Sequence, residues 1–352
     1  MTHHRQFDQC WKPSSVLVEG MMSKHVDPGE SADEAMRLVE LFDQTGIRTY
    51  MDNAIRYFRS AVAAVPPGRA DRPMYLADYG ALLDIYFQRT EEAGVITEAI
   101  SVTREAITLT PRGDPDRPGR LANLATALLH QYERYGPPMA LAEAVEVGRE
   151  AVASAPPGHP DRSLCLANLG AALGGHYQRT QDFGALTEAI DVLREAIGLR
   201  PSGGPGLAVR MFNLGRALRC KYERTLDVEV LIEAVERCRA AMALRRPGTF
   251  GHGKILHELA TTLRYQHERD GDLEVLAEAV ELAREAVDET AVGRPERVEC
   301  LSGLAKALRA SYGSTRSLEA LTEANGMVLE AIAILSTRLK EAGRSTGSPS
   351  CS

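Results

Sequence analysis

The chain repeats itself at a fixed step of 45 residues, and this periodicity limits its possible folds more than any other feature. An alanine followed by a β-branched residue recurs at Ala54-Ile55, Ala99-Ile100, Ala144-Val145, Ala189-Ile190, Ala234-Val235 and Ala279-Val280. A glycine keeps the same step at Gly68, Gly113, Gly158, Gly203, Gly248 and Gly293. Segments repeated at a constant period of this size bury their apolar faces against one another, so the sequence predicts a solenoid of about seven stacked units.

Within a repeat, the apolar spacing predicts two helices. Residues 163–178 place Leu166, Leu169, Leu173 and Tyr177 on one face, and residues 184–199 do the same with Leu186, Ile190, Leu193 and Ile197. The turn between the two helices carries an N-cap residue in every later repeat, namely Asp182, Asp227, Asp272 and Ser317. Prolines at the ends of the second helices, such as Pro66 and Pro156, stop them. The predicted fold class is therefore an all-α solenoid.

Small residues recur where two helices must approach closely. On the first helix they are Gly80, Ala125, Gly170, Gly215, Ala260 and Ala305. A larger side chain at these positions would push the helices apart. We therefore expect the first and second helices of each repeat to be in close contact at this level.

The repeats divide the chain into three segments. Residues 1–30 lie outside the periodicity and are expected to be largely disordered, because they contain few apolar residues to bury. The array is predicted to span 31–342, beginning with a capping box in which Ser31 is the N-cap and Glu34 follows three residues later. Its last helix, 318–342, has no proline loop after it and is expected to act as a terminal cap. Residues 343–352 are expected to be a disordered tail.

Composition excludes several classes of function. The net charge is −7 with charges of both signs interspersed, so no basic field attracts nucleic acid. No run of 18 apolar residues and no signal-peptide core occurs, which predicts a cytoplasmic protein without a membrane partner. The six cysteines show no metal-like spacing and are expected to be reduced thiols. We predict no metal site, no cofactor and no catalytic residue.

These motifs resemble the tetratricopeptide repeat. Its pattern is met by Asn168-Leu169-Gly170 in the first helix, then Ala189, Ala196 and Pro201. The period of that family is 34 residues, and the repeat here is longer by seven residues between Gly170 and Ala189 and by four in the following loop. The resemblance implies a right-handed superhelix that binds a protein or peptide in a concave groove. The long repeat also looks like arrays associated with CHAT proteases and signalling ATPases of actinobacteria and fungi.

In tetratricopeptide arrays the first helices line the groove, and two columns of residues on them are expected to point into it. In the C-terminal half these columns hold basic side chains, namely Arg216, Arg219, Arg264, Lys306 and Arg309. Such side chains suit an acidic peptide segment, a free carboxylate or an anionic small molecule. The alternative is that they are solvated or self-neutralised, because Arg219–Glu223 and Arg264–Glu268 have the spacing of helical ion pairs.

Two further sets of polar residues follow the repeat. Three asparagines, Asn123, Asn168 and Asn213, stand where the family binds a peptide backbone, although local packing explains them equally well. The arginines are Arg89, Arg134, Arg179, Arg224 and Arg269, and the glutamates are Glu98, Glu143, Glu188, Glu233, Glu278 and Glu323. Because these charges are so regular, we expect them to form ion pairs between repeats rather than a site.

The sequence leaves two other functions open. An enzyme using the groove as a reaction chamber would need a convergent set such as Asp84, His130 and Tyr265, and no recognised nucleophile–base pair is present. A sensor or adaptor subunit for a separately encoded CHAT-like or ATPase effector is the other alternative. A phosphate-loop motif is rejected, because Ile255 follows Lys254 where that motif needs Ser or Thr. The oligomeric state is not predicted.

Overall fold

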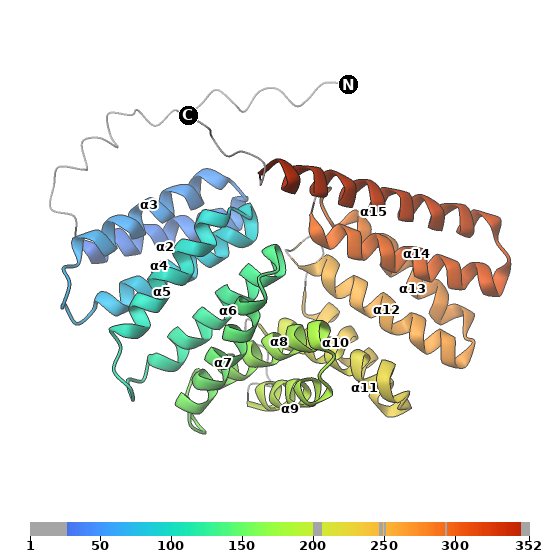
Figure 1. The fold of residues 1–352 in the computed structure, drawn as a ribbon, viewed down its shortest axis with the longest axis horizontal. Coiled ribbons are helices and arrows are strands. Elements are labelled where there is room, and N and C mark those ends of the chain that lie inside the picture. The colour runs from blue at the N-terminus through green and yellow to red at the C-terminus, as the bar shows by residue number, and fades with distance from the viewer. Residues whose placement is uncertain (1–26, 200–205, 246–248, 250, 293, 346–352) are drawn as a thin grey trace. The chain divides into compact units, whose positions relative to one another are not determined.

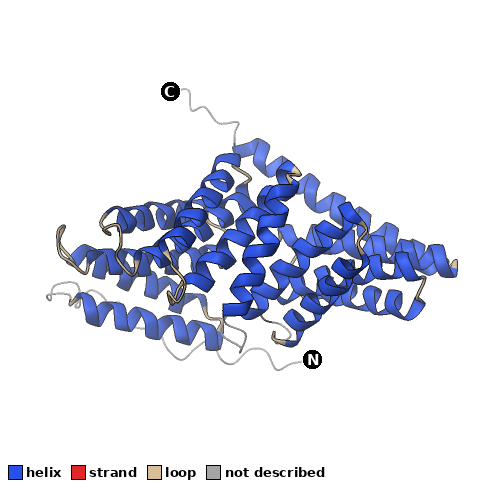
Figure 2. Ribbon diagram, turned by 90° about the horizontal axis from the view of Figure 1, so that it is seen from below, coloured by secondary structure: helices blue, strands red, loops and turns tan. Residues whose placement is uncertain are grey.

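The computed structural model describes residues 27–199, 206–245, 249, 251–292 and 294–345. In this part of the chain the ordered elements are helices, with no strand (Figures 1 and 2). The predicted all-α solenoid is confirmed. No helix in these ranges is long and apolar enough to cross a membrane. The segment 1–26, including Trp11, and Cys351 lie outside the described residues.

The helices follow one another as helix–turn–helix pairs. The first helices of the pairs are α2 (Pro28–Thr45), α4 (Arg72–Thr90), α6 (Arg117–Tyr135), α8 (Arg162–Thr180), α10 (Leu207–Thr225), α12 (His252–Asp270) and α14 (Pro295–Thr315). The second helices are α3 (Arg48–Ala64), α5 (Ala93–Thr108), α7 (Pro138–Ser154), α9 (Phe183–Leu199), α11 (Val228–Ala243), α13 (Leu273–Asp288) and α15 (Leu318–Ser345). Seven pairs therefore occupy the described ranges, as the period predicts.

The chain forms two compact parts, Met1–Ala127 and Leu128–Ser352, with the division inside α6. In the N-terminal part, α3 packs on α2 and on α4, and α4 packs on α5. In the C-terminal part each second helix packs on the first helix of the next pair, as α9 does on α10 and α13 on α14. Successive first helices also touch, because α8 contacts α10, α10 contacts α12, and α12 contacts α14. The first helices of the C-terminal part thus form one continuous layer.

Glycines and aspartates explain the turns within and between pairs. Gly68, Gly113 and Gly158 have φ of 91°, 92° and 88° in the loops after the second helices, a left-handed conformation that glycine adopts without strain. The predicted N-cap residues are confirmed: Asp227 accepts a hydrogen bond from the backbone N–H of Glu229 at 3.0 Å, and Asp272 accepts from Glu274 at 2.8 Å. The free N–H groups at these helix starts are thereby satisfied.

Close approach between the two helices of a pair is also confirmed. A Cβ atom added to Gly170 on α8 would lie 2.5 Å from Cγ of Leu193 on α9, and one added to Gly215 would lie 2.5 Å from Sγ of Cys238. Leu193 and Cys238 are themselves fully buried. The small residues on the first helix therefore let buried side chains of the second helix fit against its backbone.

Two predictions about the ends of the array are wrong. Helix α2 begins at Pro28 rather than after Ser31, and Asp27 is its N-cap, accepting hydrogen bonds from the backbone N–H groups of Gly29 and Glu30 at 2.7 and 3.1 Å. Proline favours the first turn of a helix, which moves the start upstream and leaves Ser31 buried within it. At the other end α15 continues to Ser345, three residues into the predicted tail.

The last helix is longer than the others, as predicted, but it lacks the polar outer surface expected of a cap. Its exposed side chains include Val328, Leu329, Ile332 and Leu335, with exposed fractions of 43%, 67%, 53% and 46%. Terminal repeats usually end a solenoid with a polar face. Helix α15 therefore covers apolar residues of α14 with its inner face and leaves an apolar outer face in solvent.

Candidate functional site

The candidate site is the layer of first helices in the C-terminal part, α8, α10, α12 and α14. The periodic register that predicts the columns of basic residues is kept, so Arg216 and Arg219 lie on α10, Arg264 lies on α12, and Lys306 and Arg309 lie on α14. Arg219 contacts a carboxylate of the next first helix, whereas the guanidinium groups of Arg216 and Arg264 lie against aromatic rings of their own helices. This surface is called the first-helix face below.

Arg219 is held within the protein by two carboxylates. Its Nε donates to Glu258 on α12, and its Nη1 donates to Glu223 on its own helix at 2.5 Å. The side chains of Arg219 and Glu258 are only 14% and 5% exposed. Burial pushes the pKa of Glu258 upward, but the guanidinium outweighs it and holds that pKa below its ordinary value. Arg219 is therefore committed to an internal ion pair.

Arg264 is also engaged internally. Its Nη1 donates to Glu268 one turn later on α12, and its guanidinium lies 4.2 Å from the centre of the Tyr265 ring. The Tyr265 hydroxyl donates to Glu223 of α10 at 2.6 Å. The expectation that Arg264 binds a ligand is weakened, because its charge is balanced and its side chain is only 11% exposed.

The other three predicted cations have different surroundings. Arg216 is half-buried with its guanidinium 5.6 Å from the Phe212 ring centre, and Lys306 and Arg309 are exposed. None of the three forms an ion pair with another residue in the described ranges. Arg216 nevertheless acts on the carboxylates of Glu258 and Glu299, where its charge works to lower the pKa of each, so Lys306 and Arg309 are the cations available to an anionic group.

Carboxylates outside the two predicted columns of basic residues also lie on the first-helix face. Lys254 at the start of α12 is 3.3 Å from Glu296 of α14. Burial lowers the pKa of Lys254, but nearby Glu133, Glu296 and Glu299 outweigh it, so this pKa is raised. The pKa of Glu299 on α14 is raised by burial, against the opposing effect of Lys254 and Arg216. The face is therefore mixed in charge rather than basic.

The predicted asparagines belong to two different parts of the structure. Asn168 on α8 and Asn213 on α10 are half-buried in the C-terminal part. Asn123 is half-buried on α6 and belongs to the N-terminal part. The same division applies to the set considered for an enzyme, because Asp84 lies in the N-terminal part while His130 and Tyr265 lie in the C-terminal part. Asp84 is buried.

The glutamates predicted to join neighbouring repeats do so, but with different arginines. Their partners are arginines 39 residues earlier on the preceding second helix: Arg59 with Glu98, Arg149 with Glu188, Arg194 with Glu233, Arg239 with Glu278 and Arg284 with Glu323. Arg269, one of the expected partners, pairs with Asp270 instead. These arginines reach the glutamates because both residues of each pair lie on second helices, and a long guanidinium side chain spans the gap between the helices.

The described cysteines offer no reactive thiolate. Cys165, Cys220, Cys238 and Cys300 are buried and free of disulfides. Burial raises the pKa of each thiol, that of Cys165 to about 12. These four side chains therefore pack as small apolar groups, as reduced cysteines do.

Two open pockets lie in the C-terminal part. One, of about 520 Å³, lies between α7, α8 and α9, and His176, Arg149 and Glu188 are among its lining residues. The other, of about 600 Å³, is lined by Tyr222, Leu226, Val228 and Tyr265 together with charged side chains of α10 and α12. The ring centres of Tyr222 and Tyr265 are 5.9 Å apart in an edge-to-face arrangement. Arg216, Lys306 and Arg309 are not among the lining residues of either pocket.

Comparison with solved structures finds similar helical repeat proteins. A putative kinesin light chain of Podosopora anserina with nearly identical TPR-like repeats is 23% identical, over 64% of this chain and 97% of that one, with a TM-score of 0.42. TTC0263, a thermophilic TPR protein of Thermus thermophilus, is 19% identical over 66% and 99%, with a TM-score of 0.44. Human IFIT1, in a dimer with PPP-AAAA, is 15% identical over 92% and 66%, with a TM-score of 0.50. No protein-family model and no curated protein matches the chain.

Proposed function

Because this chain folds as a tetratricopeptide-like solenoid, we propose that it is a scaffold that binds a protein or peptide on its first-helix face. A fold of this kind hosts many functions, so the function must be inferred from the residues of the first-helix face. The observation that carries the proposal is the contrast among its predicted cations. Arg219 and Arg264 are neutralised internally, whereas the exposed Lys306 and Arg309 are not.

Uncompensated positive charge on α14 favours a ligand with an acidic group. Lys306 and Arg309 lie three residues apart, hence on one side of α14, and both are exposed. An acidic side chain or a terminal carboxylate would form charge-assisted hydrogen bonds with them. The half-buried asparagines Asn168 and Asn213 on the same helix layer would offer donors and acceptors to a peptide backbone.

Electrostatic interaction across the layer supports a concave groove. Glu133 of α6 and Lys254 of α12 belong to repeats three steps apart, yet the carboxylate raises the pKa of the amine. Such an interaction needs the first-helix face to curve inward between the two residues. Glu296 and Glu299 lie beside Lys254, so the bound segment would place its acidic group away from them and toward Arg309.

Two other functions stay predictions that no observation here favours. The enzyme hypothesis needs a nucleophile or a general base, and the four described cysteines have raised thiol pKa values. The hypothesis of a sensor for a CHAT-like or ATPase effector concerns a separately encoded partner. It would use the same groove to bind that partner.

A charge-matched comparison tests the proposal. The first variant changes Arg216, Lys306 and Arg309 to Gln. The control changes Arg149, Arg194 and Arg239 on second helices to Gln, so both proteins lose three positive charges. Each protein, carrying a photo-crosslinker either on α10 or on α11, is exposed to lysate of the source organism, and captured proteins are identified by mass spectrometry.

The expected result is a partner that crosslinks from α10 and is retained by the control but reduced at least about tenfold in the first variant, because about 1.4 kcal/mol is a factor of ten in affinity and charge-assisted hydrogen bonds reach that size. Equal retention by both variants would show that the three cations do not bind it. Crosslinks from α11 alone would place the interaction on the second helices and contradict the proposal.

A further inference from the structure

A recurring contact joins the start of a first helix to the second helix of the same pair. In three repeats it uses an arginine whose guanidinium pairs with a glutamate 33 residues later: Arg72 with Glu105 at 2.9 Å, Arg162 with Glu195 at 2.7 Å and Arg297 with Glu330 at 2.8 Å. The same arginines donate to backbone carbonyls at the end of the preceding second helix, as Arg297 does to Val287 and Thr290 at 2.7 Å. The guanidinium therefore links the start of a first helix to the second helix of its own pair and to the end of the preceding second helix.

The repeat that begins with α12 departs from this pattern, as does the preceding repeat, where Leu207 and Ala240 take the two places. His252 takes the place of the arginine at the 45-residue register, while Glu285 keeps the place of the glutamate. A second acid, Glu289, is added one turn later, where the corresponding residues are Leu109, Ser154, Leu199, Leu244 and Ile334. This repeat has thus exchanged a guanidinium for an imidazole and gained a carboxylate.

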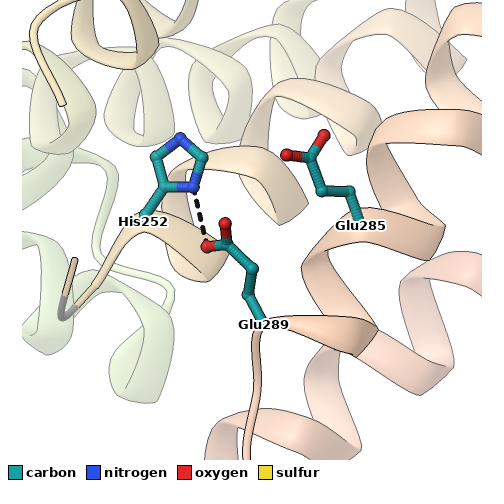
Figure 3. Close-up of side chains that lie close together, drawn as sticks. All are labelled: His252, Glu285 and Glu289. Carbon is teal, nitrogen blue, oxygen red and sulfur yellow. Dashed lines mark hydrogen bonds and ion pairs between the residues drawn. The ribbon is translucent and has the colours of Figure 1, made fainter. Parts of the chain in front are cut away.

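The three side chains converge, as Figure 3 shows. His252 is 3% exposed, and its Nδ1 shares a hydrogen bond of 2.7 Å with Oε2 of Glu289. One ligand atom from each of His252, Glu285 and Glu289 lies within 4.8 Å of the other two. The Glu285 carboxylate has no ion pair with any other residue in the described ranges.

Packing between α12 and α13 holds the imidazole in place. Gly253, next to His252, lies so close to the end of α13 that an added Cβ would be 3.1 Å from Oγ1 of Thr290 and 3.4 Å from the carbonyl oxygen of Ala286. Glu285 and Glu289 follow one another by one helical turn, so both face the start of α12 (Figure 3). The imidazole is fixed by burial, and the exposed Glu285 side chain is free to change rotamer.

We propose that His252, Glu285 and Glu289 bind a divalent first-row metal ion, of which Zn²⁺ is the best representative. An imidazole nitrogen with two carboxylate oxygens is a ligand set that Zn²⁺ accepts, with bonds of about 2.0–2.2 Å. Modest rotamer changes bring ligand atoms that already lie within 4.8 Å of one another to that geometry. The ion would supply the positive charge that the guanidinium supplies in the repeats of Arg72, Arg162 and Arg297. Three protein ligands leave a fourth position for water or for a donor from a binding partner.

The test uses the untagged full-length chain, treated with a chelator and then titrated with ZnCl₂ in a calorimeter and with CoCl₂ in an absorption spectrometer. We expect one ion per chain, a visible Co²⁺ spectrum of a nitrogen–oxygen site, and a higher Tm with Zn²⁺ because the ion binds only the folded state. The substitution Glu289→Gln should lower the affinity at least tenfold.

A second variant separates metal binding from folding. His252→Arg restores the residue that four other repeats have at this position, namely Arg72, Arg117, Arg162 and Arg297, so the protein should fold with an unchanged or higher Tm while losing the Zn²⁺-dependent rise in Tm and at least 100-fold in affinity. His176→Arg on α8 is the matched control and should bind as the native chain does. A variant with His3→Ala and His4→Ala controls for imidazoles at the N-terminus.

The outcomes are distinct. Loss of stoichiometric binding in His252→Arg and Glu289→Gln, with binding kept in both control proteins, supports the site. Absence of one-to-one binding in the native chain overturns the proposal. So does binding that His252→Arg leaves unchanged, or binding that disappears when His3 and His4 are replaced.

Discussion

Arg219 on α10 and Glu258 on α12 form a buried ion pair between residues 39 positions apart. The same separation joins Arg239 to Glu278 on successive second helices, where both side chains are well exposed. In both pairs the glutamate stands six residues before the position that lies one 45-residue repeat after the arginine. One repeat geometry thus produces a buried pair on the first helices and exposed pairs on the second helices.

The difference in burial predicts a large difference in stability. Arg219→Met should destabilise the protein by about 3–5 kcal/mol, because it leaves the Glu258 carboxylate buried without its partner. Arg239→Met should cost at most about 1 kcal/mol, as expected for an exposed pair screened by solvent. Urea unfolding followed by circular dichroism measures both. If the two variants unfold at the same urea concentration, the burial argument is wrong.

The same pair predicts a dependence of stability on pH. The pKa of Glu258 is lower in the folded than in the unfolded chain, because the Arg219 guanidinium outweighs the effect of burial. Its stabilising contribution is therefore present above the unfolded pKa and is lost as the pH falls through the folded pKa. The double variant Arg219→Met, Glu258→Leu removes both charges and should lose less of its Tm between pH 7 and pH 3 than the native chain. An equal loss in the two proteins would show that other carboxylates account for acid unfolding.

The fold could be predicted from the sequence because every repeat carries similar sequence signals for its helices, turns and contacts. The 45-residue period gives the number of pairs, Asp227 and Asp272 give helix starts, and Gly170 gives the close approach of two helices. Errors occurred at the first helix, where no earlier repeat supplies a comparison. Pro28 moved its start upstream of Ser31.

The candidate site could be predicted only in part, because its interactions run diagonally between repeats. The 45-residue register identified the basic residues. The spacing of four residues within a helix identified the Arg219–Glu223 pair. They could not identify Glu258, which stands 39 residues from Arg219, or Glu296, which stands 42 residues from Lys254. These offsets depend on how one first helix lies against the next, and this is a property of the packed layer.

The turns within the pairs predict a stabilising substitution. The residue after each first helix has a left-handed backbone. Three of these residues are glycines, namely Gly46, Gly136 and Gly271, whereas others are not, such as Leu226 with a φ of 55°. Leu226→Gly should stabilise the protein by up to about 1 kcal/mol, because glycine adopts this conformation without steric strain. Gly271→Ala at the next repeat, with φ of 72°, should destabilise it by a similar amount. Thermal unfolding of the two variants gives the signs, and a lower Tm for Leu226→Gly would contradict the prediction.

The contact between Gly170 and Leu193 predicts a strong dependence on one methyl group. Gly170→Ala should destabilise the protein by about 1–3 kcal/mol, because the new Cβ would lie 2.5 Å from Cγ of a fully buried leucine. Gly198→Ala on α9 is the matched control, since no atom lies within 4 Å of its added Cβ, and it should stabilise by up to about 1 kcal/mol through helix propensity. Combining Gly170→Ala with Leu193→Ala should cost less than the sum of the two single changes, because the added methyl group fills part of the cavity that the leucine leaves. Additive effects in urea unfolding of the double variant would mean that these two residues are not in contact in solution.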